Sequence, residues 1–285
     1  MRNTLKLCFI LLLFVLISNS FISSGYQHYN QPLSYSLSSE AFISINSDAD
    51  FASFSIPGIG SSSNPYIIEG YTFSNSLQGG IFIGQTTKNV VIRNCSLDSL
   101  GYGISLSQIV SGKISILDTS FKDCPIGVYI SETSDVDIQN NTYSLSEIHS
   151  IHISKGHNIN IQNNTFEKSG DYSIFISQGS SGSLIYHNDF FDNALENDEA
   201  TSQAYDDGRD NLWSNEELQD GNYWNDLGGT DIYHIDGIAG ATDNNPHPGP
   251  VLVNRSYAGG GDFPFFSLVF VFVVLALVSY KLKNK

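Results

Sequence analysis

The sequence has little methionine, little cysteine and little basic charge. Its one methionine is the initiator Met1, and it has three cysteines in 285 residues. A copper carrier usually offers Met, Cys or clustered His, so this composition does not favour one. Thirteen basic residues stand against 29 acidic ones, which gives a formal net charge of -16. Because a phosphate backbone attracts clustered Lys and Arg, we expect no nucleic-acid partner.

Five of the 13 basic residues lie at the two extreme ends of the chain. Arg2 and Lys6 precede an apolar run, which is the layout of a secretory signal peptide and predicts one over 1–25. Residues 263–280 carry no charge and are followed by three lysines, which predicts a transmembrane helix with the acidic body outside the cell. A cleaved sorting tail would look similar, so this alternative stays open. The sequence thus predicts a single-pass protein of the cell membrane with an extracellular body.

A repeat of about 23 residues fills the middle of the chain. Runs of the form Gly/Ser-Ile/Val-x-Ile/Leu begin at Gly80, Gly103, Gly127, Ser150 and Ser173. Each is followed by a second alternating run that ends near an aromatic residue or Leu. Period-two alternation predicts strands, and strands this short bury their apolar side chains only by stacking on the next repeat. The prediction is an all-β fold: a single-stranded right-handed parallel β-helix, a solenoid of coils of about 23 residues.

The pattern also divides the chain into segments. The predicted segments are a signal peptide 1–25, an N-terminal cap and first coil 26–79, β-helix repeats 80–191, an insertion and C-terminal cap 192–248, a linker 249–262, a transmembrane helix 263–280 and a cytoplasmic tail 281–285. Asp206-Asp207-Gly208 is predicted to be a turn within the insertion. Trp213, Tyr223 and Trp224 are predicted to plug the end of the solenoid, where an uncapped coil would expose its apolar core.

Asparagine marks the corner after the second strand of each repeat. Asn141, Asn164 and Asn188 recur there, and stacked amides at such positions can hydrogen-bond between coils. Cys95 and Cys124 lie one coil and about five residues of lateral path apart in this register, which is too far for a disulfide. We therefore predict two unpaired cysteines.

Four sites match the Asn-x-Ser/Thr glycosylation pattern. The corner already explains Asn94, Asn140 and Asn163, since Asn tolerates the left-handed backbone of a sharp turn. Asn254 lies outside the repeat and is the glycosylation candidate.

Three motifs resemble those of a known family. The Asn-Asn-Thr-Phe corners, the entry segment 65–70 and the closing segment 221–226, Gly-Asn-Tyr-Trp-Asn-Asp, are similar to those of NosD-like β-helix proteins. These belong to the carbohydrate-binding and sugar-hydrolase (CASH) group of archaeal and bacterial surface proteins. The resemblance covers about 43–248 and implies the β-helix fold. It also implies, less specifically, an accessory role in copper-centre assembly.

Neither the clustered histidines nor the C-terminal aspartates follow the spacing of a metal site. In the repeat, His152 lies on the outer face of the first strand, His157 in the next turn and His149 in the preceding loop, so nothing forces them together. The aspartates within 226–243 lack the alternation of a calcium loop. We predict no metal site and no cofactor, with calcium and copper as open alternatives.

The outer face of the second strand bears on catalysis. Hydrolysis of a glycan needs two carboxylates at a defined spacing, and the two predicted outer columns do not place two acids on consecutive coils. These columns are Val91, Ser115, Asp137, Asn160, Leu184 and Arg93, Leu117, Gln139, Gln162, Tyr186. We predict no catalytic residues, and a polysaccharide lyase or hydrolase stays an alternative.

The outer face of the first strand carries aromatic residues. Phe82, Tyr129, His152 and Phe175 recur there at the repeat spacing, with Ser105 between the first two. Exposed rings supply a large contact area at low entropy cost and suit stacking on sugars or contact with proteins. The predicted function is that of a non-catalytic module at the cell surface that binds glycans or a surface protein.

Overall fold

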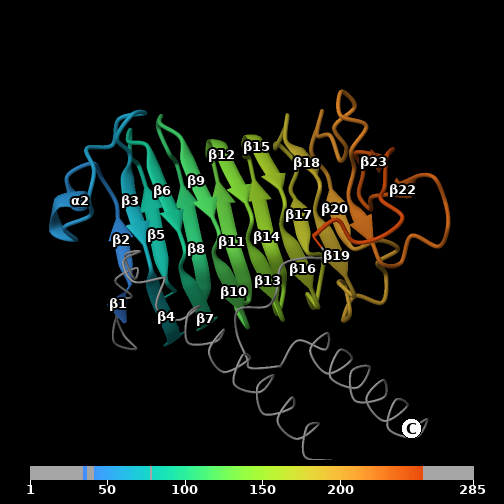
Figure 1. The fold of residues 1–285 in the computed structure, drawn as a ribbon, viewed down its shortest axis with the longest axis horizontal. Coiled ribbons are helices and arrows are strands. Elements are labelled where there is room, and N and C mark those ends of the chain that lie inside the picture. Colours follow the sequence, from blue (N-terminus) through green and yellow to red (C-terminus); the bar gives the residue numbers. More distant parts are fainter. Residues whose placement is uncertain (1–34, 37–41, 78, 253–285) are drawn as a thin grey trace, which may run out of the picture. The chain divides into compact units, whose positions relative to one another are not determined.

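The computed structural model describes residues 35–36, 42–77 and 79–252. These residues form a solenoid whose central coils each contribute one strand to each of three parallel sheets (Figure 1). This confirms the all-β parallel β-helix, while its right hand stays a prediction. Only one helix, the short α2 (Asp50–Ser53), occurs in the described part, and no described helix is long and apolar enough to cross a membrane. The predicted signal peptide, Asn254 and the helix at 263–280 lie outside the described residues.

Three sheets run along the solenoid, and we number them in the order in which a coil visits them. Sheet I runs in the order β2 (Ile43–Ile45), β5 (Ile81–Gly84), β8 (Tyr102–Ser107), β11 (Ile126–Ser131), β14 (His149–Ser154), β17 (Ile174–Ile176) and β20 (Ala204–Asp206). Sheet II comprises β3 (Tyr66–Glu69), β6 (Val90–Arg93), β9 (Ile114–Leu117), β12 (Ser134–Gln139), β15 (His157–Gln162) and β18 (Leu184–Tyr186). Sheet III comprises β1 (Tyr35–Ser36), β4 (Tyr71–Ser76), β7 (Ser96–Leu100), β10 (Ser120–Lys122), β13 (Thr142–Ser144), β16 (Thr165–Glu167), β19 (Asp189–Phe191) and β21 (Tyr223–Trp224). A separate antiparallel pair joins β22 (Tyr233–His234) to β23 (Thr242–Asp243).

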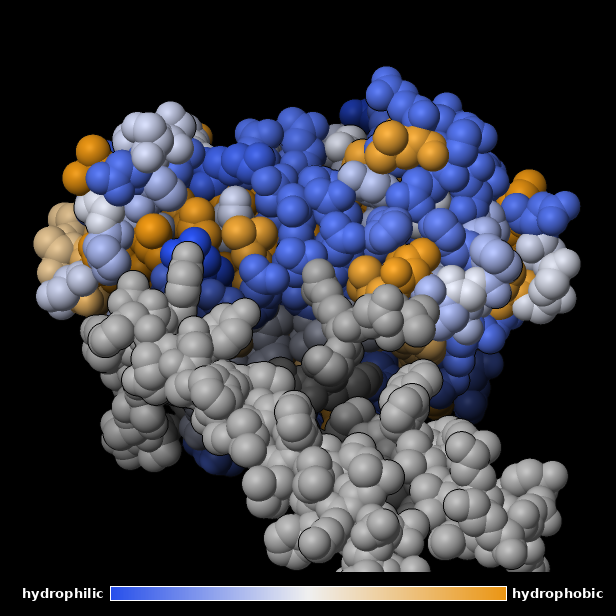
Figure 2. Space-filling view, in the orientation of Figure 1, coloured by the Kyte–Doolittle hydropathy of each residue, from blue (hydrophilic) through white to orange (hydrophobic). Residues whose placement is uncertain are grey.

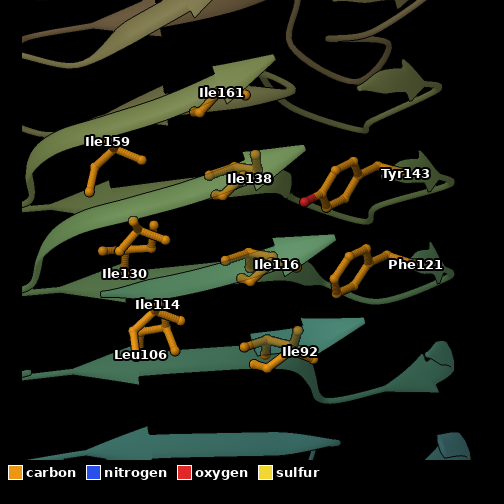
Figure 3. Close-up of a cluster of buried hydrophobic side chains, with 14 of the residues drawn as sticks. Ile92, Leu106, Ile114, Ile116, Phe121, Ile130, Ile138, Tyr143, Ile159 and Ile161 are labelled. Atoms are coloured by element: carbon orange, nitrogen blue, oxygen red, sulfur yellow. The ribbon is translucent and has the colours of Figure 1, made fainter. Parts of the chain in front are cut away.

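The core consists of columns of identical or similar side chains. Sheet II stacks Ile92, Ile116, Ile138 and Ile161 in register, and all four are fully buried (Figure 3). Sheet III stacks rings instead: the ring centroids of Phe121 and Tyr143 lie 4.6 Å apart with the planes 3° from parallel. Because parallel strands are spaced by about 4.8 Å, equivalent rings stack without leaving the register. The alternation read from the sequence therefore points each apolar column inward.

Asparagines build a hydrogen-bonded ladder at the corner between sheets II and III. Asn140 and Asn163 turn the chain in the left-handed region, with φ of 61° and 57°. The residue after each turns inward, so that the amide N–H of Asn141 donates to Oδ1 of Asn164 at 2.9 Å, and that of Asn164 to Oδ1 of Asn188 at 2.9 Å. This confirms the predicted inter-coil bonding.

Cys95 and Cys124 are free and buried, as predicted. Cys95 occupies the corner column one coil before Thr119, whose Oγ1 accepts a hydrogen bond from the Cys95 amide. Burial raises the pKa of both the Cys95 and Cys124 thiols to about 11. Both side chains therefore serve as small core residues.

The solenoid continues beyond residue 191. Strands β20 and β21 extend sheets I and III, so the prediction that Asp206 lies in a turn of an insertion is wrong. Asp206 is the last residue of β20 and is buried. Its carboxylate accepts a hydrogen bond from Nε1 of Trp213 at 3.0 Å. Trp213 and Trp224 are buried at the end of the core as predicted, whereas Tyr223 lies outside the core with its ring 5.4 Å from that of Phe191.

Candidate functional sites

A continuous strip of rings lies on the outer face of sheet I. Strand pairing places Tyr129, His152, Phe175 and Tyr205 in one column, with ring centroids 5.2, 5.1 and 4.8 Å apart. We call the full set of connected rings the aromatic strip; it comprises Tyr102, Tyr129, His149, His152, Tyr172, Phe175 and Tyr205. Tyr102 is the most open of them, at 48% exposure.

Two polar columns run beside the aromatic strip. Two residues further along each strand, Ser107, Ser131 and Ser154 stand in register on the same face. The next residue of each coil is left-handed and exposed, and these side chains bond from coil to coil: Gln85 to Gln108 at 3.4 Å, Gln108 to Glu132 at 3.1 Å and Lys155 to Glu132 at 3.0 Å. The face therefore presents rings, hydroxyls and amide or charged groups in parallel rows.

Burial keeps the strip uncharged. It lowers the pKa of His152 to about 4, with a smaller contribution from the neighbouring His149. Burial also lowers the pKa of His149, although a hydrogen bond to the Tyr172 carbonyl opposes this shift. Both imidazoles are therefore neutral near pH 7.

The structure connects most of the predicted ring positions and adds others. Phe82 stays apart, because Ser105 separates it from Tyr129 in the column. Sequence reasoning missed Tyr205, since the coil between Phe175 and its partner Tyr205 is 30 residues long and so departs from the repeat of about 23. It placed His149 in a loop, but His149 begins β14 and is buried, because Phe175 stacks on it at 4.7 Å.

The outer face of sheet II has the predicted register and a different character. Pairing places Ser115, Asp137 and Asn160 in one column, as read from the sequence. Figure 2 shows this visible face over β9, β12 and β15 as predominantly hydrophilic. Asp137 is the acid of that column, and its carboxylate pairs with Lys113 at 2.5 Å.

A group of metal-ligand type lies at the C-terminal end, where no metal site was predicted. Nδ1 of His187 lies 2.8 Å from one carboxylate oxygen of Asp220, and Nε2 of His247 lies 2.5 Å from the other. One ligand atom from each residue lies within 4.8 Å of the other two. Across 42–77 and 79–252 this is the one such group of three. The carboxylate is 18% exposed and the two rings about twice that, at 34% and 31%.

Three of the aspartates in the segment considered for calcium accept hydrogen bonds from other residues of the protein. Asp226 accepts from Gln203 and Tyr233, and Asp236 accepts from Tyr172 and Thr201. Asp243 accepts from Nε1 of Trp224 at 2.9 Å and from the amide of Asn222. Their hydrogen bonds hold the C-terminal segment together.

Comparison with known families is consistent with these features. A family model described as periplasmic copper-binding protein (NosD) matches residues 17–229, well over half of the chain. The chain belongs to the NosD family. NosD membership confirms the resemblance read from the corner motifs, and with the fold it supports a periplasmic or extracellular β-helix protein. Comparisons with curated proteins and with solved structures give no match.

The NosD description names copper. The side chains of this chain that could bind copper differ in how well they suit its two oxidation states. The described residues contain no methionine, and the raised pKa of the buried cysteines keeps them as thiols, which are poor ligands. The described residues therefore offer few of the soft sulfur ligands that Cu⁺ prefers. Two imidazoles and a carboxylate, as in His187, His247 and Asp220, suit divalent ions such as Cu²⁺ and Zn²⁺. The residues present therefore fit the divalent form of the ion.

Proposed function

We propose that this NosD-family protein binds glycans outside the cytoplasm through its aromatic strip, without catalysis. The observation that carries the proposal is the unbroken column of Tyr129, His152, Phe175 and Tyr205 on one sheet face. Planar rings match the apolar faces of sugars, and a column repeated at the strand spacing offers several such contacts along one direction. An extended glycan is the ligand that such a face suits best.

The flanking rows supply the polar half of sugar recognition. The hydroxyls of Ser131 and Ser154 lie two residues along the strand from the rings of Tyr129 and His152. Glu132, which accepts a hydrogen bond from Gln108, lies three residues from Tyr129. Binding sites for polar ligands combine apolar walls with a few placed hydrogen-bonding groups. The same face therefore offers rings that can contact the faces of sugars, together with hydroxyl and amide groups that can bond to the sugar edges.

Charge favours neutral sugars over acidic ones. The strip carries neutral imidazoles, and Glu132 is compensated by Lys155. The chain as a whole is strongly acidic, at -16. A polyanionic glycan would be repelled, so uncharged polysaccharides are the preferred class.

A binding assay with strip variants tests this function. Neutral and acidic glycans are arrayed and probed with the full chain and with a triple variant, Tyr129→Ala, Phe175→Ala and Tyr205→Ala. We expect neutral glycans to be retained and the triple variant to lose about tenfold or more in affinity, because each ring contributes of the order of 1 kcal/mol.

The matched control removes an outward ring from another sheet. Tyr186→Ala lies on the outer column of sheet II and is expected to leave glycan binding unchanged. Equal binding by the wild-type protein and the triple variant would overturn the proposal. Capture of a surface protein in place of glycans, lost in the same triple variant, would reassign the strip to the alternative partner class.

Copper handling is a second candidate function. It is favoured by the family description and by the His187, Asp220 and His247 donors. Elemental analysis of the purified full chain tests it: we expect copper in a fixed ratio to protein, and its absence after growth in copper would count against this candidate.

A further inference from the structure

We infer that His187, Asp220 and His247 form a binding site for a divalent transition-metal ion of the Cu²⁺ and Zn²⁺ class. The three side chains come from three successive layers of the solenoid end. His187 follows β18, Asp220 precedes β21, and His247 pairs its backbone with Tyr223 beyond the last coil. They meet only in the folded chain, since 33 and 27 residues separate Asp220 from the two histidines.

The fold fixes the backbone under each ligand. His187 holds the left-handed corner position, with φ of 55°, and its amide donates to the carbonyl of Gly221 at 2.6 Å. Asp220 closes a turn through two backbone hydrogen bonds with Asn215, and the amide of His247 donates to the carbonyl of Asn222 at 2.9 Å. Ligands held by a rigid scaffold lose little freedom on binding, which is what a metal site requires.

The donor set and its spacing suit one ion. Imidazole and carboxylate ligands favour borderline divalent ions, and affinity for such sets rises toward Cu²⁺ and falls again at Zn²⁺. Two ligands bound at about 2.0–2.1 Å lie roughly 3 Å apart around one ion. The distances of 2.8 and 2.5 Å between the Asp220 carboxylate oxygens and the two imidazole nitrogens are close to that value. Small side-chain rotations would make room for the ion.

The arrangement is reachable and electrostatically favourable. Both rings and the carboxylate are partly exposed, so an ion can enter from solvent and keep water in its remaining positions. An acidic surface raises the local concentration of cations. In the ion-free protein the carboxylate accepts a hydrogen bond from one nitrogen of each ring. To bind an ion through that nitrogen, each neutral ring would take its other tautomer, with its single proton on the opposite nitrogen.

This metal site gives the proposed copper-handling function a specific location, and it rests on that proposed function only in part. The family match ends at residue 229, so His187 and Asp220 lie within it and His247 lies beyond it. If copper binds the chain but not these residues, the site is refuted while copper handling survives. If Zn²⁺ binds here and copper does not, copper handling fails while the site stands.

Titration of the purified full chain with Cu²⁺ and, separately, with Zn²⁺ tests the site. We expect one equivalent of ion per chain and a loss of at least about tenfold in affinity in each of His187→Gln, Asp220→Asn and His247→Gln. Two single variants serve as controls, His234→Gln at the same end of the solenoid and His152→Phe in the strip, and both should bind as the wild-type protein does. Unchanged affinity in the three ligand variants, or no binding by the wild-type chain, overturns the site.

A second measurement needs no variant and guards against loss of folding. Electron paramagnetic resonance of the Cu²⁺-loaded wild-type chain should show coupling to two imidazole nitrogens. Hydrogen exchange of the His187 and His247 amides should slow when the ion is added, since binding ties the last layers together. A Cu²⁺ spectrum without nitrogen coupling, or exchange that slows only elsewhere, would refute the assignment.

Discussion

The central coils and the C-terminal end are stabilised in different ways. In the central coils the core contacts recur from coil to coil, as in the column of Ile116, Ile138 and Ile161. At the C-terminal end, single buried carboxylates each serve a unique set of donors, such as Asp206 with Trp213 and Asp243 with Trp224. Each repeat is stabilised by contacts with its neighbours. The last coil has no following coil, so other side chains must accept or donate the hydrogen bonds that its buried polar groups need.

The corner ladder links the two regions. It runs from Asn141 through Asn164 and Asn188 to Asn222, and the Asn222 amide then donates to Oδ2 of Asp243 at 2.7 Å. An asparagine both donates and accepts, so it continues a ladder, whereas an ionised carboxylate only accepts and so ends one. We expect the loss of an asparagine within the ladder and the loss of the carboxylate at its end to have different effects on stability.

Breaking the ladder in the central coils should have the largest effect. Oδ1 of Asn164 accepts from the amide and side chain of Asn141, and its Nδ2 donates to the carbonyls of Ile138 and Gln162. Asn164→Ala leaves these buried groups unpaired and should lower the free energy of unfolding by about 4 kcal/mol. Urea unfolding followed by circular dichroism measures this.

The control for this variant is Gln162→Ala, which removes an outward side chain of β15 and should change the free energy of unfolding by less than about 0.5 kcal/mol. A loss below about 1 kcal/mol for Asn164→Ala would mean that water replaces the ladder bonds.

Removing the acceptor at the end of the ladder should have a smaller, local effect. Asp243→Ala deprives Nε1 of Trp224 and the amide of Asn222 of their acceptor and should lower the stability of the last coil by about 2 kcal/mol. Hydrogen exchange should quicken at β20 and β21 and stay unchanged at β12, because solenoids open from their ends. Asp231→Ala, which removes an exposed acid of the same region, is the control; a uniform quickening along all coils would contradict the local picture.

The same difference explains which features the sequence predicted. The columns of sheet II, the free Cys95 and the Asn164 corner follow from a fixed period, because register in a solenoid is set by alternation and spacing alone. One missed signal was available: Asn222-Tyr-Trp repeats the Asn164-Thr-Phe corner and indicates β21. The meeting of Asp220 with His187 could not be predicted, since it depends on a turn whose length departs from the repeat.

The histidines extend the comparison to pH. His152 in the central coils has a pKa lowered to about 4 by burial, against 6.5 for a free side chain. Between these values the unfolded chain binds more protons than the folded one, so stability falls as pH drops from about 6.5 to about 4. The full shift corresponds to about 3 kcal/mol, of which about 2 kcal/mol should remain for a partly exposed ring.

His152→Phe should remove that part of the pH dependence, because a phenyl ring keeps the contacts to Tyr129 and Phe175 without titrating. Urea midpoints for the wild-type and variant proteins at pH 7, 5 and 4 give the measurement, and His157→Gln, which removes an exposed histidine, controls for the loss of an imidazole as such. Stabilities that fall in parallel for the wild-type protein and His152→Phe would show that His152 titrates in the folded state as it does in the unfolded chain, and would contradict the effect of its burial.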